Sequence, residues 1–347
     1  MATRRSGLPE PLARRRSRDL GAAAPRGERR RLLWFVARRL ISALVVLAVV
    51  SVVVFAATVA LPGNPAQAIL GRSATPAAVA ALEHQLHLNR PLIDQYAGWI
   101  GGLLHGRFGI SLAAEEPVAK LLSGRLLNSA FLVAIAGLAS IPLAIAIGAY
   151  AAWRRDRAFD VASSLVLLMI AGLPEFVVGV LLILLFATSV MHVLPAVSGI
   201  PPGEHAWDVI AAVILPALTL LINVVPYIAQ VTRASMIEVL ESDYVEMARL
   251  KGLPERIVLW RHALPNAIGP TFQVIAISLA YMTGGIVVVE YVFNFEGIGS
   301  ALQSAVLNHD LPVVQVLALL IAAVYVVLNL FADIATILVT PKLRSSL

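Results

Sequence analysis

Six long apolar segments constrain the fold of this chain more than any other feature of its sequence. They are residues 41–61, 126–152, 161–190, 209–232, 263–289 and 311–340. About 20 apolar residues cross the hydrocarbon core of a bilayer as a helix, so each segment is long enough to span. Hydrophobic residues make up 59% of the chain and charged residues 14%, whereas soluble domains carry about a quarter charged residues. The sequence therefore predicts an all-α integral membrane protein with six transmembrane helices.

The basic residues predict how these helices are oriented. With the N-terminus placed inside, 22 of the 27 Lys and Arg residues fall in inner segments and 5 in outer segments. Cytoplasmic loops carry the excess of positive charge in membrane proteins, so both termini are predicted to be cytoplasmic. The first apolar segment is longer than the core of about 7–15 residues in a signal peptide, which favours a retained helix.

The chain divides into five parts on these grounds. They are an Arg-rich cytoplasmic tail (1–31), the first transmembrane helix (32–61), an extracytoplasmic loop with short helices (62–125), a five-helix core (126–340) and a cytoplasmic tail (341–347). The first tail is expected to be disordered, and its Arg clusters favour contact with anionic lipid over a nucleic-acid arm. The outer loop is too small for an enzyme domain. Within it, Thr75 followed by Pro76 predicts a helix start, and residues 92–104 predict a second short helix.

The largest ordered cytoplasmic piece is predicted at residues 232–266. Apolar residues recur at helical spacing over 232–250, and Gly252 suits the left-handed position that ends a helix. Pro254 then begins a second helix, which Pro265 interrupts. Two sharp turns would lay a short helix roughly parallel to the membrane. Its exposed apolar stripe, flanked by charges, is typical of a protein contact.

The same region carries a resemblance to a known family. Glu246-Met247-Ala248, then Gly252 and Leu264-Pro265, resembles the E-A-A-x-x-x-G…L-P loop of ATP-binding-cassette (ABC) importer permeases, with Met247 in place of the second Ala. Other pieces follow in the order found in "B"-type subunits of the dipeptide/oligopeptide permease family. They are PGNP, HLNRPLIDQYAGW, GRFGIS, RHALPNAIGPT, VVVEYVFNFEGIG, DLPVVQ and PKLR. The resemblance covers about residues 33–345.

This resemblance implies a type I ABC importer permease fold and a set of partners. The partners would be a second homologous permease, two nucleotide-binding ATPase subunits and an extracytoplasmic substrate-binding protein, in the bacterial cytoplasmic (inner) membrane. The short cytoplasmic helix would be the coupling helix that contacts an ATPase subunit. Its implied contact residues are Asp243, Tyr244, Glu246, Met247, Ala248, Lys251 and Gly252. Ala248 would let the partner approach closely, and Glu246 would meet a basic group or a helix end on the partner.

The sequence carries no residue pattern typical of ATP hydrolysis, metal binding or catalysis. A P-loop needs Gly-Lys followed by Ser or Thr, whereas the three lysines precede Leu121, Gly252 and Leu343. ATP and magnesium are therefore expected on partner subunits, and no cofactor, metal or catalytic residue is expected here. The chain has no cysteine, which excludes thiolate sites. His84 and His87 favour a solvated helix face over a metal site.

Three residues are candidates for the translocation pathway: Glu175, Asn223 and Glu290. Glu175 follows Pro174 near the middle of the third apolar segment, where a charge costs at least about 2.5–3.5 kcal/mol and usually faces a cavity or partner. It could meet the ammonium group of a peptide or serve as a structural Glu, and the sequence favours neither. For Glu290 an interfacial charge is favoured over an outer gate or a contact with the binding protein. Asn223 could loosen its helix or pack closely. For Asp333, snorkelling to a basic group is favoured.

The resemblance also implies a function. The chain is expected to be the transmembrane subunit of an ATP-driven importer for dipeptides or oligopeptides. The substrate stays open, because relatives also carry nickel complexes and glutathione. The alternative is a stand-alone secondary transporter or channel, which would need several intramembrane charges for ion coupling.

Overall fold

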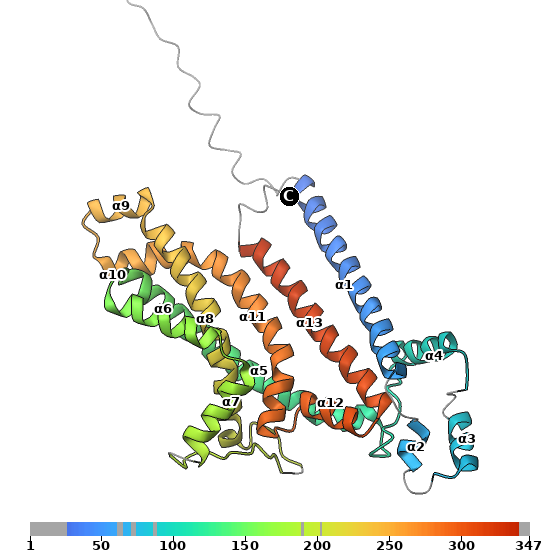
Figure 1. Cartoon of the computed structure of the whole chain (residues 1–347). Helices are drawn as coiled ribbons and strands as arrows, with labels where there is room; N and C mark the ends of the chain where they lie inside the picture. The colour runs from blue at the N-terminus through green and yellow to red at the C-terminus, as the bar shows by residue number, and fades with distance from the viewer. Residues whose placement is uncertain are drawn as a thin grey trace, which may run out of the picture.

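The computed structural model describes residues 26–60, 65–70, 74–85, 89–188, 191–201 and 203–339. Within these ranges the chain is helical apart from its connections, and the one β-bridge joins Ile110 and Pro117. Figure 1 shows long helices running between two ends, with α9 and α10 at one end and α2, α3 and α12 at the other. Residues 61–64, His87 and the tails at 1–25 and 341–347 lie outside the described residues.

Five of the described helices are long and apolar enough to cross a membrane. They are α1 (Arg26–Ala60), α5 (Val118–Trp153), α8 (Ile210–Leu240), α11 (Leu264–Phe293) and α13 (Leu311–Val339). Two of them begin earlier than the apolar pattern predicts. The first starts within the expected tail and the second within the expected outer loop, because good helix formers continue both helices beyond the hydrocarbon core.

The third predicted span is not one continuous helix. It consists of α6 (Ala158–Ala171) and α7 (Glu175–Ile183), which continues as a π-helical turn, η2 (Leu184–Thr188). The two parts are bent by 104°, so the described residues contain a sixth span only if this pair is one broken span. Pro174 lacks an N–H and disfavours helical geometry at Leu173, which explains the break. The third predicted span is therefore broken at Pro174.

Short helices occupy both ends of the molecule. They are α2 (Pro65–Leu70), α3 (Pro76–Gln85), α4 (Leu92–Leu104), α9 (Asp243–Leu250), α10 (Glu255–Ile257) and α12 (Ile298–Leu307). The amide of Ala78 donates to Thr75 Oγ1 at 3.2 Å, which confirms the predicted start of α3. The bounds of α4 match the predicted 92–104.

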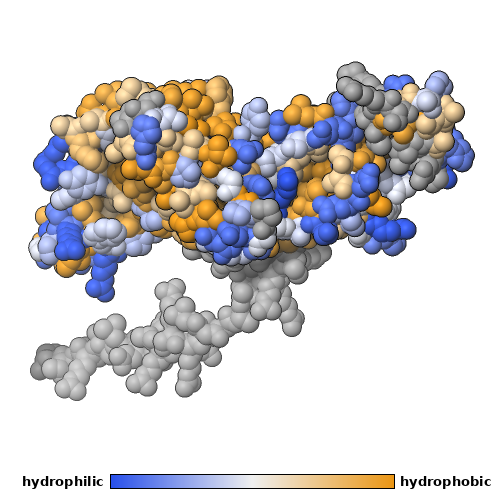
Figure 2. Space-filling model, turned by 90° about the horizontal axis from the view of Figure 1, so that it is seen from below, coloured by the Kyte–Doolittle hydropathy of each residue, from blue (hydrophilic) through white to orange (hydrophobic). Residues whose placement is uncertain are grey.

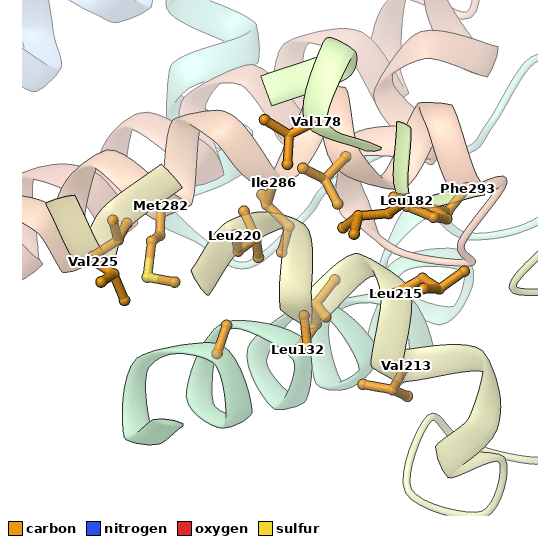
Figure 3. Close-up of a cluster of buried hydrophobic side chains, with 14 of the residues drawn as sticks. Leu132, Val178, Leu182, Val213, Leu215, Leu220, Val225, Met282, Ile286 and Phe293 are labelled. Atoms are coloured by element: carbon orange, nitrogen blue, oxygen red, sulfur yellow. The ribbon is translucent and has the colours of Figure 1, made fainter. Parts of the chain in front are cut away.

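Helix α8 is the centre of the packing. Its apolar window is 61% buried, against 6% for α1, which packs mainly along α13. Figure 3 shows Leu132 of α5, Leu220 of α8 and Ile286 of α11 meeting in one cluster. A Cβ on Gly148 of α5 would lie 2.8 Å from Cβ of Thr232, so the glycine is needed for this close approach. The spans on both sides of α9 are therefore anchored in one core.

Candidate coupling site and translocation pathway

The helical stripe predicted over 232–250 is broken into two helices. Helix α8 ends at Leu240 and α9 begins at Asp243, because Ser242 is extended with φ −78° and ψ 148°. Its carbonyl accepts from the amides of Val245 and Glu246 at 3.0 and 3.1 Å, and its hydroxyl donates to the Val239 carbonyl at 2.5 Å. Hydrogen bonds thus hold the break on both sides of Ser242, and α9 is a separate helix of about 12 Å. The apolar spacing of residues 232–250 does not predict this break.

The two faces of α9 differ sharply in exposure. Tyr244, Met247 and Leu250 are 45%, 53% and 74% exposed, whereas Val245 and Ala248 are 0% and 7% exposed. The buried pair packs with Val258 in a small cluster. Ala248 therefore contacts this chain itself and lies beneath the exposed face, not on it as expected. Asp243, Glu246, Lys251 and Gly252 are exposed as expected.

A tight turn at Gly252 returns the chain from α9 toward the membrane. Gly252 has φ +76°, in the left-handed region, and its amide donates to the Arg249 carbonyl at 2.9 Å. The Arg249 guanidinium donates to the Glu255 carboxylate at 2.8 Å across this turn. The predicted helix end and its reason are confirmed. The Arg249–Glu255 pair joins the two sides of the turn.

Pro265 does not interrupt the second cytoplasmic helix. Helix α10 continues through a π-helical turn, η3 (Val258–Ala263), directly into α11, and Pro265 sits in the first turn of α11. The wider turn accommodates the proline, which has no N–H to place. The predicted interruption is wrong. The exposed side chains of Ile257 and Trp260 extend the apolar surface next to α9.

A buried ion pair fixes the inner end of α8. Asp160, at the start of α6, is 2% exposed and accepts from Arg233 at 2.5 and 2.8 Å. The amide of Asp156 also donates to Asp160, at 3.0 Å. Arg155 and Glu241 form a second ion pair close by. These contacts hold the turn between α5 and α6 against the helix that leads into α9, and sequence reasoning missed them because the partners are far apart in the chain.

Glu175 lies at the bend between α6 and α7, half-buried. Its carboxylate rests against α11, where a Cβ on Gly285 would lie 2.7 Å from the carboxyl carbon. Among the described residues, no hydrogen bond or ion pair reaches this carboxylate. Glu175 is therefore the pathway candidate whose charged group is open to a ligand.

The other two pathway candidates are engaged within the protein. Asn223 is 8% exposed and donates to the Thr219 carbonyl at 2.9 Å. Glu290 is fully buried, and it accepts from the Ser129 hydroxyl at 2.5 Å and the Gly299 amide at 2.6 Å. Glu290 lies near the outer end of α11, and its carboxylate is buried within the protein. The structure brings neither residue together with Glu175.

The end that carries α12 is held by further buried polar contacts. Asn128 donates to the Glu296 carbonyl and accepts from the Ala206 amide, both at 3.0 Å. The carboxylate of Asp310 accepts from the hydroxyl of Ser111 at 2.5 Å and from the Leu112 amide at 3.1 Å. Figure 2 views the molecule from this end and shows hydrophilic patches between broad hydrophobic areas. These contacts connect segments that the sequence separates by more than 70 residues.

An all-helical chain with five or six candidate membrane spans among its described residues belongs to the class of polytopic membrane proteins. Comparison with protein families identifies the family. Residues 144–345 match the binding-protein-dependent transport system inner membrane component, and residues 32–128 match the N-terminal region of such components. The chain belongs to this family of inner-membrane transport proteins.

Individual relatives match over almost their whole length. A probable peptide ABC transporter permease of Sinorhizobium fredii is 37% identical over 311 residues, which are 89% of this chain and 99% of the relative. A putative peptide transport system permease of Brucella abortus is 32% identical, over 89% of this chain and 98% of the relative. A glutathione transport system permease of Escherichia coli is 33% identical, over 90% of this chain and 99% of the relative.

Family membership decides between the two functional hypotheses. The chain is the permease subunit of a binding-protein-dependent ABC importer in the inner membrane, not a stand-alone transporter. It is not itself an ATPase. ATPase subunits and a binding protein are the partners that membership in such a system implies.

Proposed function

We propose that this permease imports peptides and that α9 couples the spans to an ATPase subunit. A second, homologous permease subunit completes the pathway, and two ATPase subunits bind ATP with magnesium at the cytoplasmic end. The binding protein delivers the substrate at the end that carries α12. Closure of the ATPase pair then acts on α9 and alternates access to the pathway.

The observation that supports this coupling role is that one face of α9 is exposed and apolar while the opposite face is buried against this chain. Its outer face presents Tyr244, Met247 and Leu250, large apolar residues that are exposed next to acidic Asp243 and Glu246. Its inner face is held by Val245 and by Ala248 beneath it. A helix with its own hydrogen-bonded ends moves as one piece, so a force on its outer face passes to α8 and α11 on either side.

The proposal of a peptide substrate is supported by the relatives. Two of them are named as peptide permeases and one as a glutathione permease, and glutathione is itself a peptide. The test is uptake of a labelled dipeptide and of glutathione by vesicles containing the complex purified from its native host. Uptake of neither, with the ATPase active and the binding protein present, contradicts the substrate class.

The coupling surface is tested by copurification. Met247→Asp places a charge in the exposed apolar face of α9, and we expect the tagged permease to lose its ATPase subunits. Ile93→Asp is the matched control, since Ile93 is an exposed apolar residue on α4 at the other end. Equal recovery of ATPase subunits with both variants would show that α9 is not the docking surface.

A further inference from the structure

Among the described residues, Glu175 differs from Asp160, Glu290 and Asp333 in having no hydrogen-bond or ion-pair partner. Asp333 pairs with Arg39 at 2.9 Å, Asp160 with Arg233 at 2.5 Å, and Glu290 accepts from Ser129 at 2.5 Å. Among the residues that the structure describes, no donor or cation meets Glu175. An ionisable group within a membrane protein is costly and usually faces a cavity or a partner.

Two tyrosines lie near this carboxylate on neighbouring helices. Tyr281 lies four residues before Gly285, so it shares the face of α11 that contacts Glu175, and it is near enough to Tyr227 of α8 for the two groups to influence each other electrostatically. Both tyrosine side chains are about half exposed, although each sits in the middle of a long apolar helix. The face of an aromatic ring attracts cations, and it does so more strongly where water is excluded. One carboxylate and two exposed rings together suit a cation.

Two glycines shape the floor of this site. Gly285 lies beneath the Glu175 carboxylate, and any side chain there would collide with it. Gly284 is exposed, and a Cβ on it would meet nothing within 4 Å. The surface at Gly284, next to Gly285 and one turn from Tyr281, is therefore open.

We propose that Glu175, Tyr281 and Tyr227 form a binding site within the membrane for an organic ammonium group, such as the free amino terminus of a peptide. A single carboxylate with two rings suits an organic cation better than Ca²⁺ or Mg²⁺, which take six or more oxygen ligands. The site rests on the proposed peptide function for the identity of its ligand. It would favour substrates with a free amino group after the binding protein has released them.

The absence of cysteine from the chain allows a direct test. Gly284→Cys places a single thiol beside the site, and the full complex is treated with a cationic or a neutral methanethiosulfonate reagent. The mass shift of this chain alone is measured, so thiols on other subunits do not contribute. We expect the cationic reagent to react faster, and Glu175→Gln to reduce this preference about tenfold.

Matched variants separate the local charge from general effects. Glu238→Gln removes the same charge from an exposed position at the inner end of α8 and should leave the preference unchanged. Tyr281→Phe keeps the ring and should retain the preference, whereas Tyr281→Leu should lower it. An unchanged preference in Glu175→Gln overturns the proposal.

Protection by peptides tests the ligand class. Alanyl-alanine at high concentration should slow the reaction of the thiol, and N-acetyl-alanyl-alanine should not. Equal protection by both peptides overturns recognition of the ammonium group. If vesicles fail to import any peptide while the charge preference and its loss in Glu175→Gln remain, then the proposed function fails and the cation site stands.

Discussion

The end of the molecule that carries α9 holds its short helix by a few apolar contacts, whereas the end that carries α12 holds its short helix by buried hydrogen bonds. On α9, Val245 and Ala248 are the buried residues, and a glycine turn follows. At α12, the amides of Gly299 and Ser300 donate to Glu290, and the Ile298 amide donates to Ser129 at 2.9 Å. Directional bonds to a buried carboxylate fix a helix in one position, while a small apolar contact allows it to shift.

The largest effect is expected from removing the hydrogen bonds that hold the start of α12 to Glu290. Glu290→Ala leaves the amides at the start of α12 without an acceptor, and we expect the free energy of unfolding to fall by about 3 kcal/mol. Thermal unfolding of the purified complex in detergent measures this change. Glu296→Ala is the control, because Glu296 is exposed and contributes only its backbone carbonyl. Equal stability of the two variants would refute the difference between the ends.

At the end that carries α9, the strongest fixed contact is the ion pair between Asp160 and Arg233. Breaking this pair should have the next largest effect. Asp160→Asn removes the charge that pairs with Arg233, which is partly exposed, so we expect a loss of about 2 kcal/mol. ATPase activity stimulated by the binding protein should fall as well, since α8 loses its anchor. The charge-exchanged double variant Asp160→Arg with Arg233→Asp should recover part of both. Wild-type behaviour of the single variant would show that the pair anchors nothing.

At the turn formed by Gly252, the backbone conformation that a substituted residue can adopt should matter more than the size of its side chain. Gly252 has φ +76° and open space around it, so a side chain fits but costs about 1–2 kcal/mol in this conformation. Gly252→Val should reduce uptake at least about tenfold while the complex still assembles in the membrane. Gly252→Asn should keep most of the uptake, because Asn tolerates the left-handed region. Full uptake by the Val variant would mean that the turn does not transmit motion.

The smallest effect is expected from breaking the Arg249–Glu255 ion pair, which joins the two sides of the turn at Gly252. The Arg249–Glu255 pair is close to half exposed on both sides, so Arg249→Ala should cost about 0.5 kcal/mol or less. Uptake should stay within about twofold of the wild type, and raised salt should change it little. Arg256→Ala serves as the control on the neighbouring helix. A severe loss in Arg249→Ala alone would move the main constraint from the apolar contacts to this ion pair.

Much of the coupling site was predictable from local sequence. The helix end at Gly252 and the start of a new helix after Pro254 depend on the backbone preferences of those residues. The break at Ser242 was not predicted, because the apolar spacing continues through it without change. The burial of Ala248 was not predicted either, since it depends on Val258, which follows the turn.

The sequence by itself determined that the chain spans a membrane, and the order of its motifs indicated the family. Both properties are local, since they depend on runs of apolar residues and on short motifs along the chain. Only the tertiary structure decided the roles of the three acidic residues Asp160, Glu175 and Glu290. Asp160 pairs with Arg233, and Glu290 accepts a hydrogen bond from Ser129. Glu175 has no hydrogen-bond or ion-pair partner among the described residues. The cost of a carboxylate in an apolar protein depends on what surrounds it in space, and spacing along the chain does not reveal those surroundings.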